Sequence, residues 1–230
     1  MPFALNSQRL FEIFVSVIAM LTALPFHEFA HAWVADKLGD PTARYQGRLS
    51  LNPAKHLDLF GSISMVLFGF GWAKPVPINP YNFKNPKKGM ALSALAGPVS
   101  NLFLAFISMI LYKILFYTFP VYNINDFWGF FIYYISYLLR IIMSLNVGLA
   151  VFNLLPIPPL DGSRVLNLFL PQRVYFQIMQ YERYIVLIVM LLLFTGALST
   201  PLYYLRSILI DLLSFLTGFV DIIAKILMGA

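Results

Sequence analysis

The sequence contains no cysteine, only three histidines and few charged residues. Without cysteine the chain forms neither a disulfide nor a thiolate metal site, so metal ligands would have to be His, Asp or Glu. Charged residues make up 11% of the 230 residues and hydrophobic residues 60%. Soluble domains average about a quarter charged and about half apolar. This composition, with a mean hydropathy of +0.76, predicts a polytopic membrane protein in contact with the lipid bilayer.

The charge that is present is mostly basic, with 16 Lys and Arg against 10 Asp and Glu and a formal net charge of +6. No basic cluster is interleaved with aromatic residues, so nucleic-acid binding is not predicted. Lys and Arg instead concentrate between apolar stretches, in residues 36–58, 84–88 and 164–183. The positive-inside rule places these segments on the cytoplasmic side of the plasma (inner) membrane.

Apolar stretches of membrane-spanning length predict an all-α fold. We expect a core of three transmembrane helices at residues 10–38, 90–119 and 127–152. One or two further helices follow, in the apolar stretches 184–198 and 203–228. The sequence favours a single membrane-embedded domain over residues 1–230, with its core at 10–165 and its C-terminal helices at 172–230. The first stretch is too long for a signal peptide and lacks a small-residue cleavage site.

The first apolar stretch contains the sequence PFHEFAHAW, residues 25–33. In a helix, the four-residue step turns by about 400°, so His27 and His31 leave the same face and can bind one cation. Glu28 projects about 100° from His27, near enough to handle a water proton. This is the HExxH pattern of zinc hydrolases. The alternative is that the two histidines are interior residues hydrogen-bonded to backbone, with Glu28 as an incidental partner. Against this alternative, an ionisable group in lipid is energetically costly and needs a partner or a water-filled cavity.

The third span ends in NLLPIPPLDG, residues 153–162. Three prolines in four positions, Pro156, Pro158 and Pro159, exclude a regular helix there and predict an ordered break. The charge bias places Asp161 and the two histidines at the cytoplasmic ends of their helices, hence at one depth in the membrane. Asp161 is therefore the candidate third metal ligand. The alternative is an ordinary turn aspartate in Asp-Gly.

Residues 59–80 are apolar, but too short and too often interrupted by glycine to span the membrane. A re-entrant or β-hairpin-like segment between the first two helices fits better. Prolines at 75 and 77 would leave one edge of an extended strand without N–H groups, while Lys74, Val76 and Ile78 keep theirs on the other. Such an edge could add a substrate peptide as a further strand. A plain proline-rich loop is the alternative.

The HEFAH sequence together with NLLPIPPLDG resembles the site-2 protease family of intramembrane zinc metalloproteases. Further similarities are Asn52-Pro53, the GWAKPVP stretch at 71–77, and Ala96-Gly97-Pro98 with Asn101, so the resemblance covers roughly residues 20–165. It implies one zinc ion held by His27, His31 and Asp161, with Glu28 as the catalytic acid/base and Asn153 as a group that holds or polarises the substrate.

The substrates implied by this resemblance are membrane-anchored proteins, cleaved in or near their transmembrane segments during regulated intramembrane proteolysis. The chain would be a compact member, without room for a PDZ or CBS domain. Two alternatives remain open: a membrane protein that binds or transports metal without hydrolysis, and an inactive scaffold relative. A metal carrier does not need Glu28, and a scaffold does not need the complete set of metal and acid positions.

Overall fold

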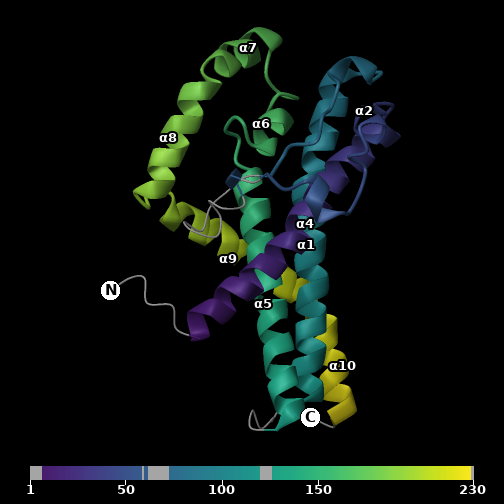
Figure 1. Ribbon diagram of the computed structural model, residues 1–230, viewed down its shortest axis with the longest axis vertical. Coiled ribbons are helices and arrows are strands. Elements are labelled where there is room, and N and C mark those ends of the chain that lie inside the picture. The colour runs from purple at the N-terminus through teal and green to yellow at the C-terminus, as the bar shows by residue number, and fades with distance from the viewer. Residues whose placement is uncertain (1–6, 59, 62–72, 120–125, 229–230) are drawn as a thin grey trace.

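The computed structural model describes residues 7–58, 60–61, 73–119 and 126–228 (Figure 1). Within these ranges the chain is almost entirely helical, with two 3-10 turns at Pro53–Lys55 and Pro80–Asn82. It forms no strand there, and its only β-type pairing is an isolated antiparallel bridge between Leu57 and Ala73. The all-α prediction is confirmed. Most of the predicted re-entrant segment, residues 62–72, lies outside the described residues.

Three long helices form the core: α1 (Ser7–Lys37), α4 (Pro86–Thr118) and α5 (Phe127–Asn153). Helices α4 and α5 lie side by side along the length of the molecule, and α1 crosses both of them (Figure 1). By length and composition each is able to cross a membrane, with Val17–Lys37 as the apolar part of α1. The predicted three-helix core is confirmed.

The helix boundaries follow local sequence signals. Helix α4 starts at Pro86, a residue suited to the first helical position, and the Asn85 side chain accepts a hydrogen bond from the Lys88 N–H. Helix α5 is capped in the same way by Asp126, which accepts from Gly129 N at 2.6 Å. Helix α5 ends at Asn153, where the predicted proline-rich break begins. Residues 154–160 are irregular, and α6 (Asp161–Leu166) follows.

The C-terminal part contains α7 (Gln172–Gln180), α8 (Glu182–Phe194), α9 (Ser199–Leu216) and α10 (Gly218–Met228). The stretch 203–228, predicted as one helix, bends by 43° between α9 and α10. Thr217 lies at the bend, and its hydroxyl donates to the Leu213 carbonyl at 2.8 Å, a bond that commonly bends helices. The described residues thus contain three helices able to span a membrane, or up to five if each bent pair counts as one.

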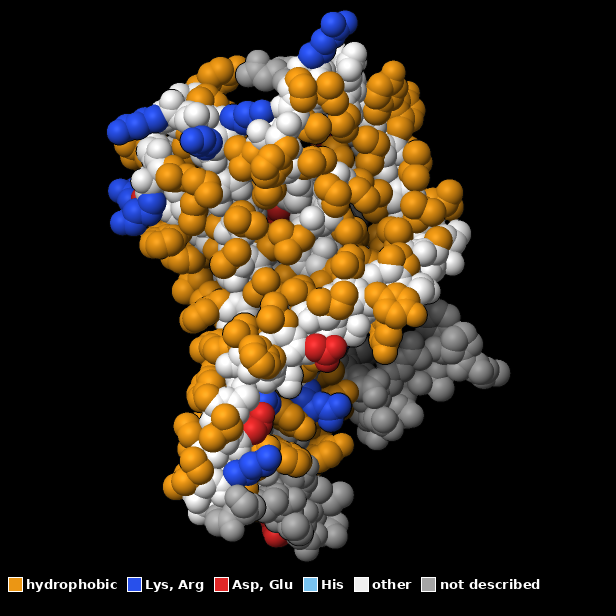
Figure 2. Space-filling view, turned by 180° about the vertical axis from the view of Figure 1, so that it is seen from behind, with side chains coloured by type: hydrophobic (Ala, Val, Ile, Leu, Met, Phe, Trp, Pro, Cys, Tyr) orange, Lys and Arg blue, Asp and Glu red, His pale blue; other side chains and the backbone are white. Residues whose placement is uncertain are grey.

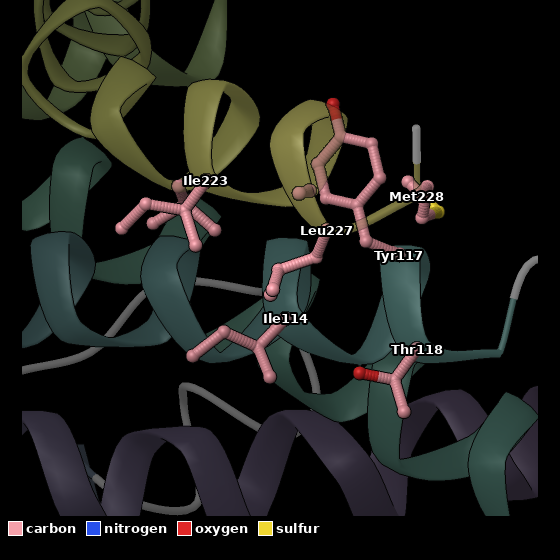
Figure 3. A pocket seen from close by; sticks show the side chains of 8 residues that line it. Ile114, Tyr117, Thr118, Ile223, Leu227 and Met228 are labelled. Carbon is pink, nitrogen blue, oxygen red and sulfur yellow. The ribbon is translucent and has the colours of Figure 1, made fainter. Parts of the chain in front are cut away.

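Helix α10 is attached to α4 by a polar contact between Lys113 and Asp221, 2.6 Å apart. The Tyr117 hydroxyl also donates to Asp221, at 3.0 Å. Asp221 is thus half-buried and paired, whereas Asp211 on α9 is exposed. Beside this contact is an apolar hollow of about 270 Å³ (Figure 3), lined by Ile114, Tyr117, Thr118, Val220, Ile223, Ala224, Leu227 and Met228.

Hydrophobic side chains cover most of the visible face in Figure 2, and several Lys and Arg side chains lie at the end of the molecule that carries α2 (Thr42–Tyr45) and α7. Further Lys, Arg, Asp and Glu side chains lie in the lower half of the same view. The broad apolar surface is typical of an integral membrane protein. The HEFAH sequence lies in the half of α1 that approaches this end, because α1 finishes at Lys37.

Candidate metal centre

The two HEFAH histidines lie together on the face of α1 that packs against α4. Helix α1 continues through Pro25, and the imidazoles of His27 and His31 are 4.5 Å apart between ring centroids. Their Nε2 atoms are 2.9 Å apart, and both residues are buried. The two histidines thus leave the same face of the helix, as the four-residue step predicts.

Asp161 reaches the histidines from the end of the proline-rich break. One oxygen of its carboxylate, Oδ2, lies 3.2 Å from His27 Nε2 and 3.3 Å from His31 Nε2. The next residue has to be glycine, because a Cβ on Gly162 would lie 2.2 Å from the Leu154 carbonyl oxygen and 2.4 Å from that of Leu155. The break therefore folds back closely on the end of α5 and brings Asp161 to α1.

The three groups fit a zinc ion in both chemistry and spacing. Separations of 2.9, 3.2 and 3.3 Å between the candidate ligand atoms compare with about 3.3 Å between neighbouring ligands in a tetrahedral zinc site. Two imidazoles and a carboxylate leave one position open, as catalytic zinc requires.

The tautomer of His31 also suits metal binding. Its Nδ1 lies 2.7 Å from the backbone carbonyl oxygen of Ser93 on α4. A carbonyl only accepts, so Nδ1 carries the hydrogen and Nε2 presents its lone pair to the cluster. Gly97, one turn further along α4, permits the close approach: a Cβ there would lie 2.4 Å from His31 Nε2 and 2.5 Å from His27 Cε1.

Glu28 lies beside the cluster without belonging to it. Its side chain is buried, and Oε2 accepts a hydrogen bond of 3.0 Å from the Val76 N–H. Lys74 N–H donates to the His56 carbonyl at 2.8 Å. Two of the three N–H groups predicted to form a free edge therefore have partners inside the chain. Residues 74–79 adopt no regular strand, and binding of a substrate along this segment stays a prediction.

Two residues that sequence reasoning missed hold the 74–82 segment against the end of α1. Arg48 donates from Nη2 to the carbonyls of Lys74 and Pro75, at 2.6 and 3.2 Å. Asp40, fully buried, accepts from Asn79 N and Asn82 Nδ2, both at 2.7 Å. No local pattern in the sequence marks these contacts, because the partners are separated by 26 to 42 positions.

The lowered pKa of the Asp40 carboxyl makes the stability of the protein depend on pH. Burial opposes its ionisation, but hydrogen bonds from Thr42, Asn82 and Asn79 outweigh burial and lower the pKa of the carboxyl. A carboxyl with a lowered folded-state pKa stabilises the protein above its unfolded pKa of about 3.9, and this contribution is lost as the pH falls through the folded-state pKa.

We expect Asp40→Asn to lower the thermal midpoint in detergent at pH 6 and the difference from wild type to shrink progressively below about pH 4. Thermal unfolding scans from pH 3 to 7 measure this, with Asp211→Asn, on the exposed face of α9, as the control. A difference that stays constant over the whole range would contradict the account.

Asn153, predicted to hold or polarise the substrate, is the half-buried last residue of α5. It is placed directly before the break that carries Asp161. Its role stays a prediction.

The fold and this cluster define a class. The protein is a polytopic membrane protein with two buried histidines, a half-buried carboxylate that meets them and a glutamate beside them, the arrangement of a metallopeptidase. The model of Peptidase family M50 matches residues 15–196. The chain belongs to this family, and the predicted membership of the site-2 protease family is confirmed.

Three curated relatives are each named "Putative zinc metalloprotease". YwhC of Bacillus subtilis is 44% identical over 80% of this chain and 81% of its own length. MJ0611 of Methanocaldococcus jannaschii is 34% identical, over 66% and 69% respectively. Rip2 of Mycolicibacterium smegmatis is 31% identical, over 81% and 70%. No solved structure gives a significant match.

Proposed function

We propose that this protein is an intramembrane zinc endopeptidase that cleaves membrane-anchored proteins in or near their transmembrane segments. The observation that carries the proposal is the meeting of three groups within hydrogen-bonding distance of one another: His27 and His31 on α1, a helix able to span a membrane, and Asp161 at the start of α6, after the break that follows α5. Family membership and the zinc metalloprotease names of the relatives support the same conclusion.

Each residue of the centre has a distinct role in this proposal. His27, His31 and Asp161 hold one zinc ion per chain. Zinc, when bound, polarises the scissile carbonyl and lowers the pKa of a water molecule to about 7. Glu28 accepts the proton of the attacking water and returns it to the leaving amine. Asn153 binds the substrate backbone beside the centre.

The proposed site lies in the cytoplasmic half of the plasma membrane. His31 is six residues before the end of α1 at Lys37, which corresponds to about 9 Å along the helix. The segments after this end, and those around α7, carry the concentration of Lys and Arg that the positive-inside rule assigns to the cytoplasm.

The substrate has to unwind before cleavage, because a helix keeps its peptide bonds within the hydrogen-bonded backbone. We propose that the 74–78 segment supports the unwound stretch through its remaining backbone groups. The same segment also fixes the orientation of the Glu28 carboxylate, through the hydrogen bond that the Val76 N–H donates to it.

Val76→Pro removes this N–H, and we expect it to lower kcat by about 10- to 100-fold, the range for loss of a hydrogen bond to a charged group. Val76→Ala retains the N–H and serves as the matched control for the lost side chain. Cleavage assays on both variants, with thermal unfolding as the folding check, measure the effect. Equal kcat for the two variants would refute a role for the Val76 N–H.

The proposal as a whole is tested on the purified protein in detergent. We expect one zinc per chain by elemental analysis, and cleavage of at least one member of a panel of single-span membrane substrates. Chelation should abolish cleavage, and zinc added back should restore it. Stoichiometric zinc without cleavage of any substrate, but with zinc uptake in reconstituted vesicles, would favour a metal carrier instead.

A further inference from the structure

His27 and His31 differ in how their second ring nitrogens are held. His31 Nδ1 has the Ser93 carbonyl as its acceptor. His27 Nδ1 is buried and has no hydrogen-bond partner in the part of the chain that the structure describes. A metal-binding histidine normally has an acceptor for this N–H, because the acceptor fixes the tautomer and the ring orientation. His27 therefore lacks a partner of the kind that His31 has.

The side chain of Asn101 on α4 also lacks hydrogen-bond partners. Its side chain is fully buried, and neither Oδ1 nor Nδ2 has a hydrogen-bond partner among the described residues. Buried amide groups are nearly always hydrogen-bonded to protein or ordered water. Asn101 Oδ1 on α4 is therefore an acceptor without a donor, and an Nδ1–H of His27 on α1 would be a donor without an acceptor, among the described residues.

The packing of α1 against α4 places these two groups near each other. His31 contacts Ser93, and the Ser100 hydroxyl lies 3.4 Å from the Phe26 carbonyl. The two contacts show that the helices run antiparallel here, so that positions near 27 on α1 face positions near 97 to 101 on α4.

The face of α4 agrees with this register. Ser93, Gly97 and Asn101 follow one another at four-residue steps, all buried. Gly97 faces both imidazoles, because a Cβ added there would meet both of them. Asn101 lies one turn beyond it, about 6 Å along the axis and about 40° round it, in the direction of His27.

We propose that Asn101 is the positioning residue for His27: its side-chain oxygen accepts the His27 Nδ1–H, across one bound water or on rotation of the amide. A water with polar groups on both sides satisfies the condition for buried hydration. His27 is then held with Nδ1 protonated and Nε2 directed at the metal. This inference rests on the proposed zinc site, and its test does not depend on proteolysis.

The test compares two buried asparagines. Asn101→Leu removes the amide with little change in size. Asn146→Leu makes the same change on α5, where the residue is also fully buried and its Oδ1 also has no partner among the described residues. We expect Asn101→Leu to weaken zinc binding, measured by competition with a chelator, by about 10- to 100-fold. Asn146→Leu should leave it within about twofold, and Asn101→Gln should recover part of the affinity.

Nitrogen-15 NMR of histidine-labelled wild-type protein gives a readout that requires no variant. In the zinc-bound protein at pH 8, His27 should carry its proton on Nδ1, and this proton should exchange slowly with solvent. An Nε2–H tautomer, or equal loss of zinc affinity in the two leucine variants, would overturn the inference. Unchanged zinc affinity in Asn101→Leu would do the same. A protein that binds zinc as described but cleaves nothing would instead contradict only the proposed function.

Discussion

Glu28→Gln is expected to abolish cleavage while leaving one zinc bound per chain. Glutamine keeps the size of the side chain and can still accept from the Val76 N–H at the position of Oε2. It does not take up a proton at neutral pH, so the attacking water keeps its proton and the leaving amine receives none. General acid–base catalysis contributes about 100- to 10,000-fold, and kcat should fall by a factor in this range.

The matched control is Glu182→Gln, at the first residue of α8. It makes the same chemical change outside the centre and should leave kcat within about twofold. Cleavage assays and elemental analysis on the same preparations distinguish a loss of catalysis from a loss of bound zinc. Full cleavage by Glu28→Gln would remove Glu28 from the mechanism, whereas loss of zinc along with cleavage would make Glu28 a group needed for metal binding.

Gly97→Ala is expected to destroy the metal centre through a single added methyl group. The new Cβ would lie 2.4 Å from His31 Nε2 and 2.5 Å from His27 Cε1, so either both rings or α4 must move. Misplacement of reacting groups by about 1 Å can cost about 100-fold. We expect at least this loss in zinc affinity and in kcat.

The control for Gly97→Ala is Gly148→Ala on α5, where a Cβ meets no atom of the described residues within 4 Å. Alanine is favoured over glycine inside a helix by about 1 kcal/mol, so this variant should unfold at the same temperature as wild type or a higher one. Chelator competition and thermal unfolding test both variants. Normal zinc affinity in Gly97→Ala would show that α4 does not pack on the histidines as described.

The core helices and the grouping of the three candidate metal ligands were predictable from the sequence, because each part follows from rules that act locally along the chain. The apolar lengths set the spans, the four-residue step sets the common face of His27 and His31, and the prolines at 156, 158 and 159 force the break before Asp161. The distribution of Lys and Arg then gave these groups a common depth, and the structure brings them together.

The contacts that complete the site were not predictable, since they depend on packing between segments far apart in the chain. Val76 N–H on Glu28 joins positions 48 residues apart, and the Ser93 carbonyl on His31 joins positions 62 apart. Backbone groups occur at every residue, so no side-chain pattern marks the ones that are used. The pairing of Lys113 with Asp221 is of the same kind, because it joins positions 108 residues apart.

The most direct test of the central claim is zinc anomalous scattering from crystals of the purified protein. We predict a single strong peak within about 2.0–2.2 Å of His27 Nε2, His31 Nε2 and an Asp161 carboxylate oxygen, with Glu28 facing its open side. A zinc peak elsewhere in a folded chain, or an Asp161 carboxylate directed away from the two histidines, would contradict the account.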